Sequence, residues 1–364
     1  MSTPPRGMSA VTVSSSDSSS DEPRVLYHGA ELASWYSSAV NEHHAVRQAA
    51  GVFDFSFRAM FSAKGNDRAR FLHSMTTNDV KGLAPGQGLY ATLLDVRGHI
   101  LADVEIYCEE DQFLVTTDAD LLDKVLAVLG RYNIGGRVPL ESLPLTAISI
   151  QGPNADGIVR RVLATQLPGP DEYRHSRSPV VGKPARVIKA GSTGEEGYQI
   201  WAASGDLPLI ADALLDAGRA QGLIRCGCAA LETLRIEAGI PKYGSELGED
   251  TLPLEAGIMN ALSFNKGCYI GQEIVERARS RGRVNWKLAG LFIDSPAVPA
   301  VGETVLHQEK AMGEITSACV SPTLGRTIAL GYVRREIAEP GSRVVLGSGA
   351  AAEVAELPFY RRPA

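Results

Sequence analysis

The segments Thr304-Val-Leu-His307, Ala311-Met-Gly-Glu-Ile-Thr-Ser-Ala-Cys-Val320 and Thr327-Ile-Ala-Leu-Gly-Tyr-Val333 decide the expected fold of the C-terminal part of the chain. They are short, and turns that contain glycine or proline separate them. Residues 288–293 and 343–346 share this pattern, and no helical periodicity interrupts the series. Evenly spaced short strands predict a small antiparallel β-barrel, which we expect to form a separate C-terminal domain.

Upstream of these strands, helical and extended patterns alternate along the chain. Apolar residues at intervals of three and four predict helices, and short β-branched or aromatic runs between turn residues predict strands. This mixture indicates an α+β fold. The expected helices are residues 31–50, 119–129, 155–163, 207–221 and 229–238, and the expected strands are 88–95, 99–108, 112–117, 145–151, 186–190 and 198–202.

The composition is that of a folded chain with more than one domain. Its 364 residues suffice for two or three domains, and 44% of them are hydrophobic. The net charge of −6 argues against stable binding to duplex nucleic acid. No apolar run approaches the ~18 residues of a membrane span, so no membrane is expected. Residues 1–23, rich in serine, threonine and proline, are predicted to be a disordered tail.

The five cysteines are few and odd in number, which favours a reducing cytoplasm over a disulfide-linked secreted protein. Cys226 and Cys228 form a C-x-C pair, but no second pair stands at the spacing of a zinc site. We therefore interpret this pair as buried small hydrophobic residues and expect no metal site.

The segment Asn265-Lys-Gly-Cys-Tyr-Ile-Gly-Gln-Glu273 carries the strongest local signal for chemistry. Cys268 follows a glycine and lies two residues after Lys266, and a neighbouring positive charge favours the reactive thiolate. Gln272 and Glu273 follow at a glycine turn and could hydrogen-bond a polar ligand. The alternative is a loop held by two glycines around a buried, inert thiol.

Two charged features are less specific. Residues 276–287 include four arginines beside Trp286, a composition that binds carboxylates, phosphates, an acidic protein or single-stranded nucleic acid. The alternative is a solvated linker. Glu195 lies in the glycine-rich turn 191–197, and Asp103 lies on a strand that otherwise carries Ile, Leu and Val. Asp103 points either into a cleft or into solvent; alternation does not decide, and solvent is the more frequent outcome.

Several short motifs follow one another along the chain: His44-Ala-Val-Arg-Gln-Ala-Ala-Gly-Val-Phe-Asp54, Met75-Thr-Thr-Asn-Asp79, Pro85-Gly-Gln-Gly-Leu-Tyr90, Gly194-Glu-Glu-Gly197, Leu234-Arg-Ile-Glu-Ala-Gly239, Tyr243-Gly244, Pro253-Leu-Glu-Ala-Gly257, Ser321-Pro-Thr-Leu-Gly325 and Gly331-Tyr-Val333. In these motifs and their order the chain resembles the glycine-cleavage T-protein (aminomethyltransferase) superfamily. The resemblance implies three domains around a central tetrahydrofolate cavity, with two interleaved α+β domains over residues 24–275 and the barrel over residues 276–364.

Within that superfamily, Lys266-Gly-Cys-Tyr-Ile-Gly-Gln-Glu273 is similar to the signature of the YgfZ branch, which T-proteins lack. That branch is described as folate-binding, as a helper in making or maintaining iron–sulfur proteins, and as tRNA-modifying. The resemblance implies tetrahydrofolate as cofactor, Cys268 as the working thiol and Asp103 as a catalytic acid. The implied folate contacts are Glu195, Tyr198, Gln199, Arg235, Lys266, Tyr269, Gln272 and Glu273.

The chain also departs from the T-protein pattern at three positions. T-proteins carry two consecutive acids after a glycine turn, where this chain has Ala102 and Asp103. Gln199 replaces the last acid of T-G-E-D-G-x-E-I, and Leu231 replaces the first arginine of R-D-x-L-R. A carboxylate pairs with pterin amino groups more strongly than an amide does, so we expect folate binding to be weaker or differently arranged.

Three functions follow as hypotheses. We favour a cytoplasmic, folate-binding accessory protein of iron–sulfur cluster assembly or repair, with iron–sulfur biogenesis proteins or clients as partners. The alternative is an enzyme, a tetrahydrofolate-dependent one-carbon (aminomethyl) transferase in which Asp103 is the critical acid. The third is a protein associated with tRNA modification, in which the basic segment would contact RNA.

Overall fold

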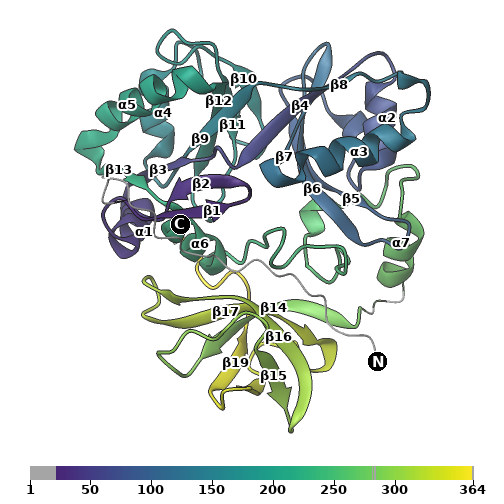
Figure 1. Cartoon of the computed structure of the whole chain (residues 1–364), viewed down its shortest axis with the longest axis vertical. Helices are drawn as coiled ribbons and strands as arrows, with labels where there is room; N and C mark the ends of the chain where they lie inside the picture. The colour runs from purple at the N-terminus through teal and green to yellow at the C-terminus, as the bar shows by residue number, and fades with distance from the viewer. Residues whose placement is uncertain (1–21, 281, 283, 363–364) are drawn as a thin grey trace.

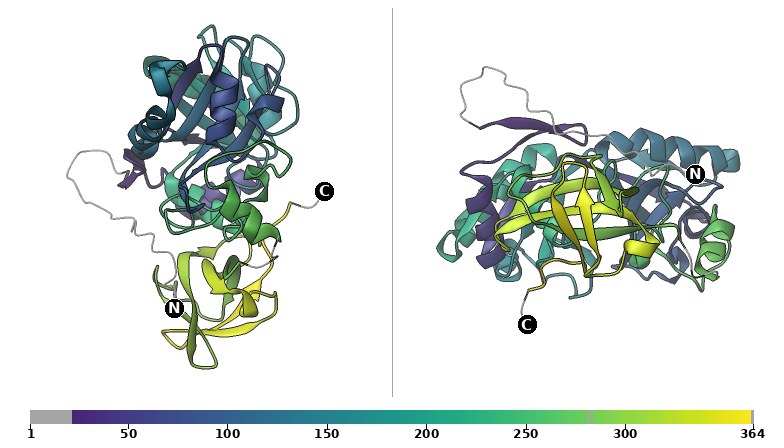
Figure 2. Two further views of the ribbon diagram at one scale, coloured as in Figure 1. Left: turned by 90° about the vertical axis from the view of Figure 1, so that its right-hand side faces the viewer. Right: turned by 90° about the horizontal axis from the view of Figure 1, so that it is seen from below.

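The computed structural model describes residues 22–280, 282 and 284–362, which form two α+β lobes and a β-barrel (Figure 1). The expected α+β class and the C-terminal barrel are thereby confirmed. The barrel lies below both lobes, and the views of Figure 2 place it across their shared end. Within the described part of the chain, no helix is long and apolar enough to cross a membrane.

The first lobe is built on a six-stranded sheet with the order β10-β11-β12-β9-β3-β13. Its strands alternate, so one face packs against α4 and α5 and the other against α1 and α6. The elements of this lobe are β3 (Ala50–Asp54), β9 (Leu145–Gln151), β10 (His175–Arg177), β11 (Arg186–Lys189), β12 (Gly197–Ala203), β13 (Leu223–Cys226), α1 (Ala39–Gln48), α4 (Ala155–Val162), α5 (Leu207–Gly218) and α6 (Cys228–Glu237).

The second lobe is a five-stranded antiparallel sheet with the order β5-β6-β7-β4-β8, covered on one face by two helices. Asp95 shapes the turn between β5 and β6, because its Oδ1 accepts hydrogen bonds from the N–H groups of Arg97 and His99. The elements are β4 (Arg58–Lys64), β5 (Gly88–Leu94), β6 (Ile100–Cys108), β7 (Gln112–Asp118), β8 (Leu140–Ser142), α2 (Arg68–Met75) and α3 (Leu122–Tyr132).

The barrel closes in the order β14-β17-β16-β15-β18-β19 around a core of aliphatic side chains. The sequence predicts five of its strands; the sixth, β19 (Ala351–Ala355), completes the ring because it pairs with both β14 and β18. The other strands are β14 (Trp286–Ile293), β15 (Thr304–His307), β16 (Lys310–Ser321), β17 (Arg326–Arg334) and β18 (Arg343–Leu346).

Three sequence expectations differ from the structure or lie beyond it. The helix expected over residues 31–50 is wrong at its beginning, because β1 (Arg24–Tyr27) and β2 (Ala30–Ala33) form a hairpin there. The helix starts only at Ala39, where the Ser38 hydroxyl accepts a hydrogen bond from the Asn41 N–H. Helix α7 (Gln272–Ser280) occupies part of the presumed linker. Of the expected disordered tail, residues 1–21 lie outside the described residues.

Candidate functional site

A cavity of about 760 Å³ lies between the two lobes. The β1–β2 hairpin, strand β14 of the barrel and Leu357 also border it. Aromatic rings form much of its wall, and several acids and one glutamine face it. Its volume is in the range of sites for drug-sized ligands. Lining residues include Tyr27, His28, Phe55, Phe57, Arg58, Tyr90, Asp103, Glu105, Asp118, Tyr173, Gln199, Leu231, Arg235, Tyr243, Leu288 and Leu357.

Asp103 faces this cavity from β6. Ala102 and Val104 on either side of it are buried in the core, so strand alternation directs Asp103 to the opposite face. The Tyr90 hydroxyl donates a 3.1 Å hydrogen bond to its Oδ2, whereas its Oδ1 is buried and has no partner among the described residues. Burial and the nearby Asp118 carboxylate raise the pKa of Asp103 to about 6, against the opposing effect of Arg58 and Tyr90. The site therefore holds an acid that titrates close to neutral pH with one free oxygen.

Arg58 organises the acids around Asp103. Its Nη1 lies 2.8 Å from Asp118 Oδ1, and its Nη2 lies 3.3 Å from Glu105 Oε2. The charges of Glu105, Asp118 and Asp103 outweigh burial and raise the pKa of Arg58 above its usual value, so the guanidinium stays cationic. Asp118 and Glu105 are thus paired, which leaves Asp103 as the acid that has no cationic hydrogen-bond partner in this group.

Gln199 enters the cavity from β12 in the other lobe. Its residue is only 2% exposed, and the Trp201 indole Nε1 donates a 3.0 Å hydrogen bond to its Oε1. Gln199 and Trp201 are two residues apart on one strand and therefore share a face. Asp103 and Gln199, predicted from separate parts of the sequence, are brought to one cavity.

Comparison with known proteins assigns this fold and cavity to a family. Residues 23–266 match the GCVT N-terminal domain, and residues 287–361 match the glycine cleavage T-protein C-terminal barrel domain. The chain belongs to the glycine-cleavage T-protein family.

Two curated relatives in this T-protein family illustrate the similarity. The aminomethyltransferase of Bacillus subtilis (strain 168) is 34% identical over 343 residues, which cover 92% of this chain and 94% of the relative. The aminomethyltransferase of Moorella thermoacetica is 33% identical over 334 residues, covering 90% and 91%. The crystal structure of the glycine cleavage system aminomethyltransferase T from Bartonella henselae superposes with a TM-score of 0.85 at 24% identity, covering 93% of this chain and 94% of that one, and shows the same fold.

T-protein aminomethyltransferases use tetrahydrofolate as the one-carbon acceptor, so the cofactor expected from the sequence is that of the family. The cavity fits this group. Tyr90, Tyr173 and Tyr243 supply aromatic surface for a pterin ring, and the Gln199 amide supplies a hydrogen-bonding group. Gln199 and the tyrosines are the residues that would contact it.

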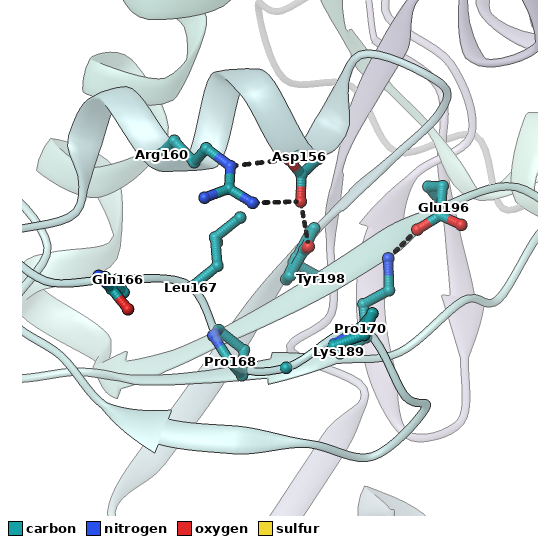
Figure 3. A pocket seen from close by; sticks show the side chains of 10 residues that line it. Asp156, Arg160, Gln166, Leu167, Pro168, Pro170, Lys189, Glu196 and Tyr198 are labelled. Carbon is teal, nitrogen blue, oxygen red and sulfur yellow. Dashed lines mark hydrogen bonds and ion pairs between the residues drawn. The ribbon is translucent and has the colours of Figure 1, made fainter.

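Two predicted folate contacts, Tyr198 and Glu195, lie away from the cavity. Tyr198 points to the opposite face of β12 from Gln199 and lines a second pocket of about 350 Å³, where its hydroxyl donates to Asp156 Oδ1 (Figure 3). Glu195 is buried, with Oε1 paired to Arg47 and Oε2 to Arg362, each at 3.0 Å. Both oxygens of Glu195 are therefore used within the protein.

Arg235 borders the cavity, but its guanidinium is fully engaged by protein groups. It pairs with Glu232 at 2.9 Å and Glu246 at 2.8 Å, and it donates to the Ser317 hydroxyl of the barrel at 2.6 Å. Near it, the fully buried Glu237 accepts hydrogen bonds from Arg47 on α1 and from barrel hydroxyls. These groups hold α6 against the barrel and so fix one wall of the cavity.

Lys266 does not line the cavity. Its ammonium donates to the carbonyl oxygens of His73, Thr76 and Asn78, where it closes the C-terminal end of α2. Burial lowers the pKa of Lys266 to about 8. Its three N–H donors thus match three carbonyls, and its position is explained by the fold.

Cys268 is exposed and does not line the cavity, unlike the buried thiol of the alternative interpretation. Tyr269 beside it is buried against the residues behind the cavity wall, and burial raises its pKa to about 12. Gln272 accepts a hydrogen bond from the Tyr269 N–H at 3.4 Å, and Glu273 is exposed on α7. The four residues therefore present one thiol and one carboxylate to solvent.

A glycine contact positions this cysteine loop. Gly271 has a φ of +80°, and a Cβ atom there would lie 2.6 Å from the Asp95 carbonyl oxygen and 3.1 Å from the Cα of Gly98. Gly98 has a φ of +81°, and a Cβ atom there would lie 3.0 Å from the Cβ of Ile274. The start of α7 can approach the β5–β6 turn only because both residues lack side chains.

Residues 276–280 of the basic segment form the end of α7, and Trp286 and Lys287 begin β14. Arg279 stacks on the Phe264 ring at 4.4 Å and pairs with Glu276 at 3.4 Å. Arg281 and Arg283, which the prediction of a nucleic-acid or carboxylate site included, lie outside the described residues.

One cluster of potential metal ligands occurs in the described part of the chain, formed by His28, Asp118 and Asp120 at the cavity edge. The Arg58 guanidinium already pairs with Asp118, so it neutralises part of the negative charge of this cluster. Cys226 and Cys228 are buried in the core of the first lobe, as expected for small hydrophobic residues.

Sequence reasoning missed Tyr90 and Arg58 as parts of the site. Tyr90 ends the Pro85–Tyr90 motif, which was a usable signal, whereas Arg58 gave none because it reaches Asp118 only through the pairing of β4 with β7.

Proposed function

We propose that this protein is a tetrahydrofolate-dependent aminomethyltransferase, in preference to the accessory role that its cysteine motif predicts. The observation that carries the proposal is Asp103: a half-buried carboxylate that lines a cavity large enough for the cofactor and whose Oδ1 has no partner among the described residues. The curated relatives named aminomethyltransferase, which match over nine-tenths of the chain, support the same choice.

The missing acid at position 102 does not weaken this proposal. Ala102 is 1% exposed and packs in the core of the second lobe. Because neighbours on a strand point to opposite faces, an acid at 102 in this backbone would face that core. Of the two positions, only 103 faces the cavity. Leu231 has a different effect, because it lines the cavity and makes that wall apolar where T-proteins carry an arginine.

In the proposed reaction Asp103 binds and orients the amine of the aminomethyl donor. An aliphatic amine is protonated near neutral pH, and the Asp103 carboxylate, which lines the cavity, offers it a charged acceptor. Tetrahydrofolate, when bound, supplies the nitrogen that accepts the carbon. Tyr90 fixes the second oxygen of Asp103 and so sets the direction of the first. A pKa of about 6 also lets Asp103 accept a proton from the amine and release it to solvent at neutral pH.

The test is turnover with tetrahydrofolate and an aminomethyl-loaded lipoyl protein, read as methylene-tetrahydrofolate. Asp103→Asn is expected to lower kcat by about 100-fold or more, within the usual range for a positioned acid, while tetrahydrofolate binding stays within about tenfold. Asp156→Asn is the matched control, because that acid faces the second pocket, and it should keep its rate. Wild-type protein that binds tetrahydrofolate but forms no methylene product would overturn the proposal.

A second candidate function is the folate-binding accessory role of the YgfZ type. The exposed Cys268, held by a glycine contact at the start of α7, is the observation that favours it. Cells that lack this protein would be complemented with Cys268→Ala, and the activity of iron–sulfur enzymes measured. Full activity with this variant would exclude the cysteine from the role.

An association with RNA rests on the basic segment alone. It would require an RNA affinity that falls steeply with salt concentration, and a salt dependence that is lost in Arg279→Ala.

A further inference from the structure

The second pocket, on the opposite face of β12 from the cavity, contains a buried lysine. Lys189 on β11 is the direct cross-strand neighbour of Tyr198, so its side chain shares the face that packs against α4 and α5. This side chain is only 5% exposed, and its ammonium lies 4.6 Å from the centre of the Tyr198 ring. Figure 3 shows the ammonium pointing toward Glu196. A cation is thus buried in a pocket of about 350 Å³.

The fold does little to compensate for the burial of this charge. Among the described residues, the acid paired with Lys189 is Glu196, whose own side chain is 59% exposed, and pairs with exposed acids contribute little to stability. Burial lowers the pKa of Lys189, and the carboxylates of Glu172 and Asp156 oppose that shift only in part. Glu196 takes one of the three N–H donors, and the Tyr198 ring covers one side of the ammonium. A buried ammonium with unused donors favours an anionic group of a ligand.

The other charged groups of the pocket decide which kind of ligand fits. Asp156 is used on both oxygens, because Oδ1 accepts from the Tyr198 hydroxyl at 2.7 Å and Oδ2 from Arg160 Nε at 2.8 Å. Glu196 has its Oε1 left without a partner among the described residues. The lining holds two cations and two acids, so its formal charge is zero and a ligand with a net charge is disfavoured. A carboxylate bound to Lys189 would face the like charge of Glu196 unless the ligand also carries a cation beside it.

We propose that this pocket binds a free α-amino acid, whose carboxylate is held by Lys189 and whose ammonium is held by Glu196. An α-amino acid carries both charges close together and has no net charge. Its side chain would lie against the apolar wall formed by Leu167, Pro168 and Pro170. The pocket is at the lower end of the size range of ligand sites, which suits so small a molecule. The site is separate from the cavity proposed for tetrahydrofolate and goes beyond the proposed function.

The experiment begins with the melting temperature of the full chain, measured with each of the common free L-amino acids at millimolar concentration. At least one of them should raise it, because a ligand that binds only the folded state stabilises that state. Calorimetry then gives the dissociation constant of the amino acid with the largest effect. Its analogues without the ammonium or without the carboxylate should each bind roughly 10- to 100-fold more weakly, because each leaves a charged group of the pocket without its partner.

Two variants locate the binding in this pocket. Glu196→Gln changes an exposed side chain, and Lys189→Met replaces a buried charge by an apolar chain of similar length, so both are expected to fold. Each should weaken the affinity for the amino acid by about tenfold or more. Lys183→Met is the matched control, because Lys183 pairs with Asp206 outside the pocket, and it should bind as the wild type does. Glu196→Gln carries the test alone if Lys189→Met does not fold.

No rise in melting temperature with any amino acid would overturn the inference. An amino acid that both variants bind as tightly as the wild type does would also overturn it, because that ligand would occupy another site. Equal affinity for the amino acid and for its analogue without the ammonium would contradict the proposed ligand class. Tetrahydrofolate binding and turnover test the cavity separately, so either proposal can fail while the other stands.

Discussion

Replacing Asp103 by asparagine is expected to stabilise the fold while it removes the acid from the cavity. Burial and the neighbouring Asp118 raise the pKa of this carboxyl from 3.8 to about 6. The folded chain therefore holds the proton to a higher pH than the unfolded chain does. The free energy of unfolding therefore falls as the pH rises from 3.8 to about 6. Above that pH the ionised carboxylate destabilises the folded protein by the full amount.

The size of the effect follows from the pKa shift. About two pKa units at roughly 1.4 kcal/mol each give a cost of about 3 kcal/mol for the ionised form in the folded protein. Asparagine avoids that charge and still offers an oxygen to the Tyr90 hydroxyl. We expect Asp103→Asn to be more stable than the wild type by about 1–3 kcal/mol at pH 8. The gain should shrink at pH 4.5 and vanish below pH 3.8.

Calorimetric melting temperatures of both proteins at pH 8 and pH 4.5 measure this difference. Asp95→Asn is the control of opposite sign: burial alone would raise the pKa of Asp95, but hydrogen bonds from His99 and Arg97 hold it below its usual value. That variant should be less stable than the wild type at pH 8. Equal melting temperatures for wild type and Asp103→Asn at pH 8, or a gain that does not depend on pH, would refute the reasoning.

Three further predictions concern the glycine contact, the barrel interface and the thiol. Gly271→Ala should destabilise the fold by about 2–4 kcal/mol, because its Cβ would lie 2.6 Å from the Asp95 carbonyl oxygen at a positive φ. Gly267→Ala is the control: its Cβ would lie 3.8 Å from the nearest atom, so the melting temperature should change little. Glu237→Gln should cost about 3 kcal/mol and expose the barrel interface to limited proteolysis, because it removes a buried charge that pairs with Arg47; unchanged cleavage would contradict this. Cys268→Ser should keep the melting temperature and the tetrahydrofolate affinity, because the thiol is exposed outside the cavity; a tenfold weaker affinity measured by calorimetry would place it at the ligand.

The sequence predicts the strands well where local pattern and pairing agree. Strand β9 has the expected bounds, because its residues alternate between two buried faces and turn residues border it. The hairpin at residues 24–33 was missed because its apolar residues also fit helical spacing. Only the pairing of Val25 with Leu32 distinguishes the hairpin from a helix, and strand pairing is visible in the structure but not in the local sequence pattern.

The site was predicted in part for a similar reason. Period-two alternation states that Tyr198 and Gln199 face opposite sides of a strand, but it does not say which side holds a cavity. That choice depends on the second lobe, which brings Asp103 to the same space across more than ninety residues of sequence. A conspicuous motif is also no guide to the position of a site. The motif of Cys268 lies outside the cavity, whereas Tyr90 and Arg58, which the sequence does not single out, line it.

Leu357 lines the cavity together with Tyr27, although 330 residues separate them in the chain. The segment that follows Leu357 is tied down where the Tyr360 N–H donates to the Glu237 carbonyl and Arg362 pairs with Glu195. A chain still being synthesised therefore has no complete cavity until residues 357–362 have left the ribosome and docked. Ligand binding therefore reports that the segment from Leu357 to Arg362 has docked and closed this wall.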